Sequence, residues 1–135
     1  MPDQMEQRRS VLVADDESHI GRIIKMKLEH GPFDVTLVYD GKEAADALRS
    51  SPTGYDLVVL DLMMPELSGL GVLEVLRTEM RSNIPAIILT AAGEGDQEKS
   101  AMDTGATAFV TKPFSPKKLY ALVARLTGVD GAEEG

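Results

Sequence analysis

The sequence contains no cysteine among its 135 residues. This absence excludes disulfide bonds and zinc sites built from thiolates. No apolar run is long enough to cross a bilayer, and the first ten residues lack the apolar core of a secretory signal. We therefore expect a cytoplasmic protein with no membrane insertion.

Positive charge is also scarce, because 14 lysines and arginines face 22 aspartates and glutamates and leave a formal net charge of −8. A protein that tracks along nucleic acid needs a basic face. The charge balance therefore predicts no direct contact with nucleic acid. No Walker loop or dinucleotide fingerprint occurs either, so nucleotide binding has little support.

The length fits one domain, which we place at residues 10–127. Residues 1–9 form a polar lead-in, and residues 128–135 form an acidic, glycine-rich tail that we expect to be flexible. Short apolar runs predict five strands, at Val11–Ala14, Val35–Tyr39, Leu57–Leu60, Ala86–Leu89 and Ala108–Val110. Three of these runs are continuously apolar, as expected of central parallel strands.

The segments that follow the five strands have helical periodicity. Ser18 is the expected N-cap of the first helix, and Ser115 followed by Pro116 is expected to begin the last. A helix at Asp96–Thr104 has few large apolar residues, so we expect it to be loosely packed. Five alternating strands and helices predict an α/β fold with a doubly wound parallel sheet, although these patterns leave the strand order open.

Polar side chains capable of chemistry follow four of the predicted strands. They are Asp15, Asp16 and Glu17 after the first strand, Asp61 after the third, Thr90 at the end of the fourth, and Thr111 and Lys112 after the fifth. In a parallel sheet the carboxyl ends of the strands lie on one rim. These groups are therefore expected to converge.

Three carboxylates in one crevice repel one another by about 3 kcal/mol per pair at about 5 Å and an effective dielectric near 20. A hard divalent cation would relieve this repulsion, and an all-oxygen site suits Mg²⁺. Lys112 and Thr90 could then contact the oxygens of a phosphoryl group. The set predicts phosphoryl transfer onto the carboxylate of Asp61.

The motifs resemble a response-regulator receiver domain of two-component signalling, over roughly Ser10 to Thr127. They are the acidic pair, Asp-x-x-x-Pro from Asp61, Thr-Ala from Thr90 and Lys-Pro-Phe from Lys112. The resemblance implies a flavodoxin-like sheet with strand order 2-1-3-4-5 and five flanking helices. It also implies a phosphoryl donor, which is a sensor histidine kinase or a histidine phosphotransfer protein.

The resemblance also implies a role for individual residues. Asp61 is the phosphoacceptor, Lys112 binds phosphate, and Thr90 and Phe109 form the conformational switch. The Mg²⁺ ligands are Asp15, Asp16, Asp61 and the backbone carbonyl of Met63, with Asp15 bound directly or through water. The Lys112–Pro113 peptide bond is expected to be cis.

The expected function is a phosphorelay switch, not an enzyme. Phosphorylation changes the surface of helix 4, strand 5 and helix 5, and so controls an unknown protein target. Met63 and Ala92 cannot hydrogen-bond an attacking water strongly, so slow autodephosphorylation is expected. No output domain follows Thr127 in this sequence, and we expect a single-domain regulator.

The sequence leaves four alternatives open. The chain could be a receiver cut from a longer regulator, or a degenerate receiver that acts only as a scaffold. A Mg²⁺-dependent phosphohydrolase would usually carry a second acid where Met63 stands. A flavin-binding module of similar fold would favour a hydroxyl-rich loop in place of Asp15, Asp16 and Glu17.

Overall fold

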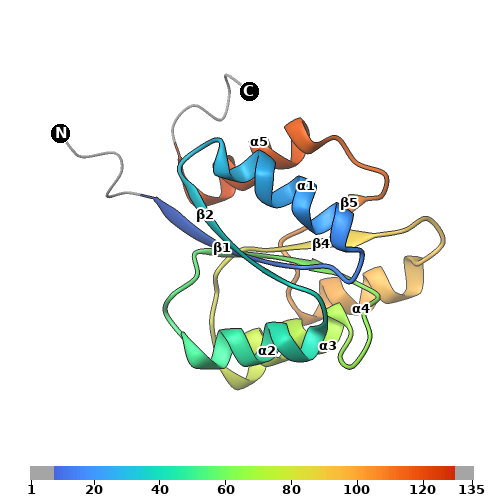
Figure 1. The fold of residues 1–135 in the computed structure, drawn as a ribbon. Helices are drawn as coiled ribbons and strands as arrows, with labels where there is room; N and C mark the ends of the chain where they lie inside the picture. The colour runs from blue at the N-terminus through green and yellow to red at the C-terminus, as the bar shows by residue number, and fades with distance from the viewer. Residues whose placement is uncertain (1–7, 130–135) are drawn as a thin grey trace.

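A parallel sheet between two layers of helices forms the protein (Figure 1), shown by a computed structural model that describes residues 8–129. The predicted lead-in and tail lie outside the described residues, except for Arg8, Arg9, Gly128 and Val129. None of the helices within residues 8–129 is long and apolar enough to cross a membrane.

The sheet has five strands in the order β2-β1-β3-β4-β5, and every neighbouring pair is parallel. The strands are β1 (Arg9–Ala14), β2 (Phe33–Val38), β3 (Leu57–Asp61), β4 (Ala86–Thr90) and β5 (Ala108–Thr111). The predicted class and strand order are confirmed. The order reverses between β1 and β3, where an open α/β sheet forms a crevice at its carboxyl end.

Burial explains which runs became central strands. Every residue of β3 and β4 is buried, because helices cover both faces of the sheet there. The edge strand β2 instead alternates, with Phe33 and Val35 buried and Asp34 and Thr36 exposed. It begins two residues before the predicted start and ends before Tyr39, which is exposed.

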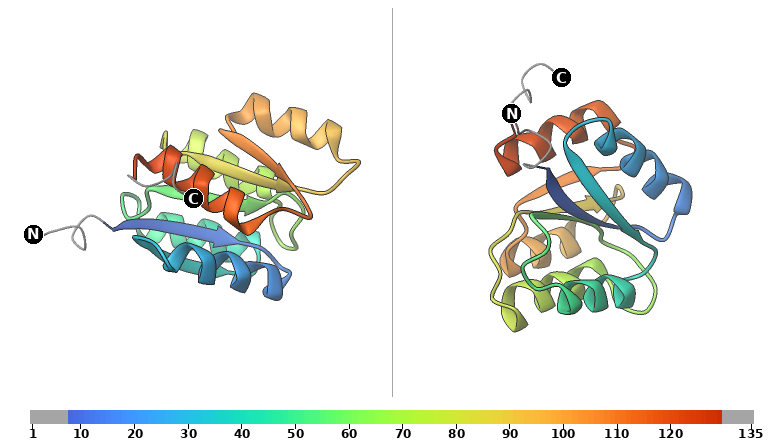
Figure 2. Two further views of the ribbon diagram at one scale, coloured as in Figure 1. Left: turned by 90° about the horizontal axis from the view of Figure 1, so that it is seen from above. Right: turned by 60° about the vertical axis from the view of Figure 1, so that its left-hand side comes forward.

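Helices α1 (Ser18–Glu29) and α5 (Pro116–Thr127) cover one face of the sheet, and α2 (Gly41–Ser50), α3 (Gly69–Glu74) and α4 (Gly95–Thr104) cover the other (Figures 1 and 2). The core is accordingly divided in two. Val11 and Val13 of β1 belong to the half under α1 and α5, whereas Leu12 and Ala14 belong to the other half. This alternation follows from the period of two in a strand.

The predicted N-cap is correct for α5 but not for α1. The Ser115 hydroxyl accepts a hydrogen bond from Lys118 N at 3.2 Å, and Pro116 opens α5, as predicted. The expectation that Ser18 caps α1 was wrong, because Glu17 occupies the cap position and makes no side-chain cap bond. The backbone N–H of Glu17 instead donates to Asp15 Oδ1 at 2.9 Å. The acidic loop therefore determines where α1 begins.

A π-helical turn, η2 (Val75–Glu79), extends α3 and places Arg77 under the end of α4. The Arg77 guanidinium donates to the carbonyl oxygens of Gly105 at 3.0 Å and Ile84 at 2.7 Å. Helix α4 buries only Ala101, so the prediction of loose packing is confirmed. The hydrogen bond from Arg77 to Gly105 therefore anchors the residue that ends α4.

Candidate functional site

Three carboxylates meet where β1 and β3 end. One oxygen each from Asp15, Asp16 and Asp61 lies within 4.8 Å of the others. The pairing of Ala14 with Leu60 explains this meeting, because the residues that follow each strand come out side by side. Asp15 is fully buried and Asp61 is 7% exposed, whereas Asp16 is exposed.

The loop after β3 passes close to the backbone of Asp61, the predicted phosphoacceptor. Gly69 N donates to Leu62 O at 2.8 Å, and a Cβ at Gly69 would collide with the backbone carbonyl of Asp61. Glycine is therefore required here for close approach of two backbone segments. The Asp61 side chain is held in turn by Met63 N, which donates to Asp61 Oδ1 at 3.3 Å.

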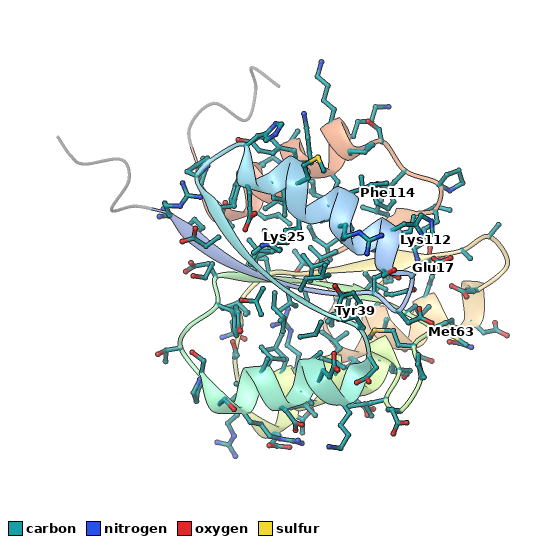
Figure 3. The ribbon with its side chains drawn as sticks, viewed as in Figure 1. Glu17, Lys25, Tyr39, Met63, Lys112 and Phe114 are labelled. Carbon is teal, nitrogen blue, oxygen red and sulfur yellow. The ribbon has the colours of Figure 1, made fainter. Side chains whose placement is uncertain are left out.

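Lys112 brings a cation from β5 to these acids. Its Nζ lies 3.0 Å from Asp15 Oδ2, 3.0 Å from Asp61 Oδ2 and 2.8 Å from Glu17 Oε1. The backbone N–H of Lys112 donates to Thr90 O, and the Lys112–Pro113 peptide bond is cis, as the resemblance implied. Figure 3 shows the Lys112 and Glu17 side chains together at this rim.

The contact with Glu17 was not among the predicted site contacts. Glu17 is the third acid in the run after β1, and that run was the available signal. A carboxylate at this position faces the same rim as Asp15 and Asp16, although sequence alone does not indicate which acid pairs with the lysine. The structure assigns the shortest of the three ion-pair contacts to Glu17.

Electrostatics at the rim follow from burial and from this pairing. Burial raises the pKa of Asp61 from 3.8 to about 7; the Lys112 ammonium opposes this and the charge of Asp15 adds to it. Burial alone would lower the pKa of Lys112, but its three carboxylate partners raise it. Hydrogen bonding to Lys112 lowers the pKa of Glu17. The lysine is therefore charged throughout the physiological range.

The acidic cluster fits a hard cation. Its donors are all oxygens, which suits Mg²⁺ or Ca²⁺ better than softer ions. Asp15 Oδ2 is buried, and its close partner is the Lys112 ammonium at 3.0 Å. A buried carboxylate oxygen needs a countercharge, which a bound cation could supply in place of the lysine.

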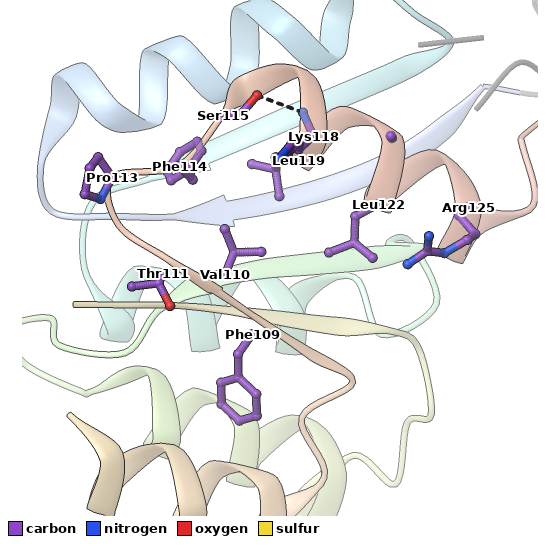
Figure 4. Close-up of a pocket in the computed structure, with 11 residues that line it drawn as sticks. Phe109, Val110, Thr111, Pro113, Phe114, Ser115, Lys118, Leu119, Leu122 and Arg125 are labelled. Atoms are coloured by element: carbon purple, nitrogen blue, oxygen red, sulfur yellow. Dashed lines mark hydrogen bonds between the residues drawn. The ribbon is translucent and has the colours of Figure 1, made fainter. Parts of the chain in front are cut away.

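Thr90 is the last residue of β4, and Phe109 is the second residue of the neighbouring strand β5. Thr90 is fully buried, and its Oγ1 has no hydrogen-bond partner. Phe109 is half-buried and packs on the α2–α4 side of the sheet, whereas Val110 packs against the α1–α5 side. Figure 4 shows these two side chains on opposite faces of β5. The roles of Thr90 and Phe109 as a switch stay a prediction.

A groove of about 610 Å³ runs beside β5 and α5, on the surface predicted to change with phosphorylation. Apolar side chains form much of its wall, and Lys118 and Arg125 line it as well (Figure 4). Its apolar lining residues include Val110, Phe114, Leu119 and Leu122.

Comparison with known proteins points to one family, that of response regulators. The family model of the response regulator receiver domain matches residues 11–124. The chain is 41% identical over 117 residues to a probable transcriptional regulator, ycf27, of Porphyridium aerugineum, and this match covers 87% of the chain and 47% of the relative. The response regulator ArlR of Staphylococcus saprophyticus is 34% identical over 113 residues, with 84% and 50% covered. The chain thus spans about half the length of the curated relatives it matches.

Solved structures agree in fold. The receiver domain of the Francisella response regulator 1452 superposes with a TM-score of 0.79 at 38% identity, covering 90% of this chain and 98% of that one. The receiver domain of DrrB, described as activated by BeF₃, superposes with a TM-score of 0.78 at 29% identity, again covering 90% and 98%.

Proposed function

The chain belongs to the response regulator receiver domain family, and from this membership we propose that Asp61 accepts a phosphoryl group from a phosphohistidine. The donor is a sensor histidine kinase or a histidine phosphotransfer protein. Receivers are signalling domains rather than classical enzymes. The proposed product is a phosphorylated regulator in a two-component phosphorelay.

The arrangement around the Asp61 carboxylate carries the proposal. Its oxygen Oδ2 lies 3.0 Å from the Lys112 ammonium, and the acids of Asp15 and Asp16 lie beside it. A buried carboxylate with a fixed cation at one side is positioned to attack phosphorus while the cation holds a phosphoryl oxygen. An Asp61 oxygen forms the new bond to phosphorus, the bond from phosphorus to the imidazole nitrogen breaks, and the histidine keeps the released electron pair.

Asp15, Asp16 and Asp61 would hold Mg²⁺, with the backbone carbonyl of Met63 as a fourth protein ligand. When bound, Mg²⁺ supplies positive charge that neutralises both the acids and the incoming phosphoryl oxygens. The buried Asp15 Oδ2 supports this assignment, since its close partner is the Lys112 ammonium at 3.0 Å and a bound cation would take over the countercharge that the lysine now supplies.

The proposed switch begins at the hydroxyl of Thr90. Its Oγ1 has no partner, so it gains a hydrogen bond by moving toward a phosphoryl oxygen on Asp61. Phe109 can then rotate into the vacated space. Helix α4 buries a single side chain and so costs little to displace, which supports a two-state change in the α4–β5–α5 surface.

The phosphorylated state is proposed to be long-lived. Met63 and Ala92 are both exposed at the positions that border the phosphoryl group in this family. Neither side chain can orient a water for attack, and Met63 is long enough to screen the phosphorus. Met63 also argues against a phosphohydrolase, which would place a second acid at this position.

The readout partner is proposed to be a protein, with no nucleic acid bound by the receiver itself. The relatives named as transcriptional regulators are about twice as long as this chain. Their length and names support an output that is transcriptional and that is carried by a protein region other than the receiver.

Phosphotransfer from a purified, phosphorylated histidine kinase tests the proposal directly. The Asp61→Asn variant should take no label, whereas Asp103→Asn, an exposed acid of α4, should label as the wild type does. Undiminished labelling of Asp61→Asn would overturn the assignment. Because a similar receiver is described as activated by BeF₃, beryllofluoride with Mg²⁺ is the matching equilibrium probe.

A further inference from the structure

Glu17 is the partner of Lys112 that lies outside the acidic cluster. Its Oε1 is 2.8 Å from Lys112 Nζ, closer than either Asp15 or Asp61 at 3.0 Å. The Glu17 side chain is 52% exposed, whereas those of Asp15 and Asp61 are 0% and 10% exposed. Lys112 is therefore held by two buried acids and by one acid that can swing into solvent.

The backbone of Glu17 is fixed although its side chain is free to move. Its N–H donates to Asp15 Oδ1 at 2.9 Å, and its carbonyl accepts from Ile20 N at 2.9 Å and Gly21 N at 3.1 Å. Within residues 8–129, its only ion pair is the one with Lys112. The half-exposed carboxylate is thus attached to a fixed backbone beside the acidic cluster.

We propose that Glu17 is a positioning residue that holds Lys112 in the unphosphorylated protein and competes with the phosphoryl group for it. This inference rests on Asp61 being the phosphoacceptor. A phosphoryl group on Asp61 carries a charge of about −1.5 to −2, which replaces the single charge of the free carboxylate. Lys112 must then leave Glu17 to contact the new oxygens, and Glu17 and the phosphoryl group repel each other.

The proposal predicts effects of opposite sign on two ligands. Without the Glu17 charge, Lys112 is available to a phosphoryl-like anion, so the anion binds more tightly. The freed lysine also pairs more fully with Asp15 and Asp61, which therefore bind a cation less well. Since the Glu17–Lys112 pair is half exposed, each change should be about two- to fivefold in Kd.

The experiment compares the full chain as wild type, Glu17→Gln and a control, Glu74→Gln. Glu74 is an exposed acid at the end of α3, so its replacement removes the same charge away from Lys112. Calorimetric titration measures the Kd of Mg²⁺ alone, and then of beryllofluoride at saturating Mg²⁺. Glu17→Gln should weaken Mg²⁺ binding and tighten beryllofluoride binding, while Glu74→Gln changes neither. Weakening of both ligands by Glu17→Gln would show a merely structural role and overturn the proposal.

A second background separates competition through the lysine from general charge. In Lys112→Met, the effect of Glu17→Gln on beryllofluoride should shrink to the part that comes from direct repulsion, and an effect of undiminished size would overturn the proposal. The two proposals also fail differently. Wild type that binds no beryllofluoride with Mg²⁺ would count against the phosphoacceptor assignment. Normal wild-type binding that is unchanged in Glu17→Gln would count against the Glu17 inference alone.

Discussion

Replacing the carboxylate of Asp61 by an amide should make the protein more stable. Burial raises the pKa of Asp61 from its ordinary value of 3.8 to about 7, which means that the charged form is disfavoured in the folded state. Multiplying this difference by about 1.36 kcal/mol per pH unit gives about 4 kcal/mol as an upper limit. The raised pKa already includes the opposing hydrogen bond from the Lys112 ammonium, and an amide oxygen at this position can still accept from that ammonium. We therefore expect Asp61→Asn to gain up to about 4 kcal/mol near pH 8.

The sign of the pH dependence follows from the raised pKa. Between pH 3.8 and about 7, the folded protein keeps a proton at Asp61 that the unfolded chain has released. The stability contributed by this proton is complete below the unfolded pKa and is lost as the pH rises to about 7. The advantage of Asp61→Asn should therefore grow across this window and stay constant above it.

Urea unfolding followed by far-UV circular dichroism, without divalent cations, measures this advantage at about pH 5 and about pH 8. The control Asp103→Asn should shift stability by less than about 0.5 kcal/mol, because that acid is exposed. Equal or lower stability of Asp61→Asn near pH 8 would refute the burial argument. A gain of the same size at both pH values would show that it does not arise from titration. Mg²⁺ at about 100 times its Kd should stabilise the wild type by about 2.7 kcal/mol, and the variant by less.

Three further substitutions test other parts of the structure. Thr90→Val should stabilise the fold by about 1 kcal/mol in urea unfolding, because the buried Oγ1 has no partner; a loss of stability would show that the hydroxyl is bonded. Arg77→Met should cost about 3 kcal/mol and speed hydrogen exchange in α4, because it leaves the carbonyls of Gly105 and Ile84 unpaired; unchanged exchange would contradict this anchor. Met63→Asn should speed loss of the phosphoryl group several-fold, because an amide can orient water, and an unchanged decay rate would argue against screening.

The sequence predicts the sheet and the meeting of its polar residues because both follow from local patterns. Apolar runs define the strands, and parallel strands must place Asp15, Asp61, Thr90 and Lys112 at one end. The bounds of the edge strand β2 are harder to predict from sequence. Its start at Phe33 depends on burial under the α1–α5 layer, which an alternating pattern shows only in part.

Features that depend on tertiary contacts were not predictable. The cap of α1 follows from the bond between Glu17 N and Asp15 Oδ1, so the hydroxyl of Ser18 was a misleading signal. The π-helical turn places Arg77 against the carbonyl of Gly105, 28 residues away, and no local pattern indicates that contact. The choice of Glu17 as a close partner of Lys112 depends on where β5 ends relative to β1.

The contact between Glu17 and Lys112 joins positions 95 residues apart in the chain. Closing so long a loop is an entropic cost that must be met before the contact contributes, and such distant contacts form slowly in folding. During synthesis, Asp15 and Asp61 leave the ribosome well before the lysine that balances them. A nascent chain that stops short of β5 would hold the acids without their cation. Competence to accept a phosphoryl group should therefore be acquired late, so that only a completed fold can carry the signal.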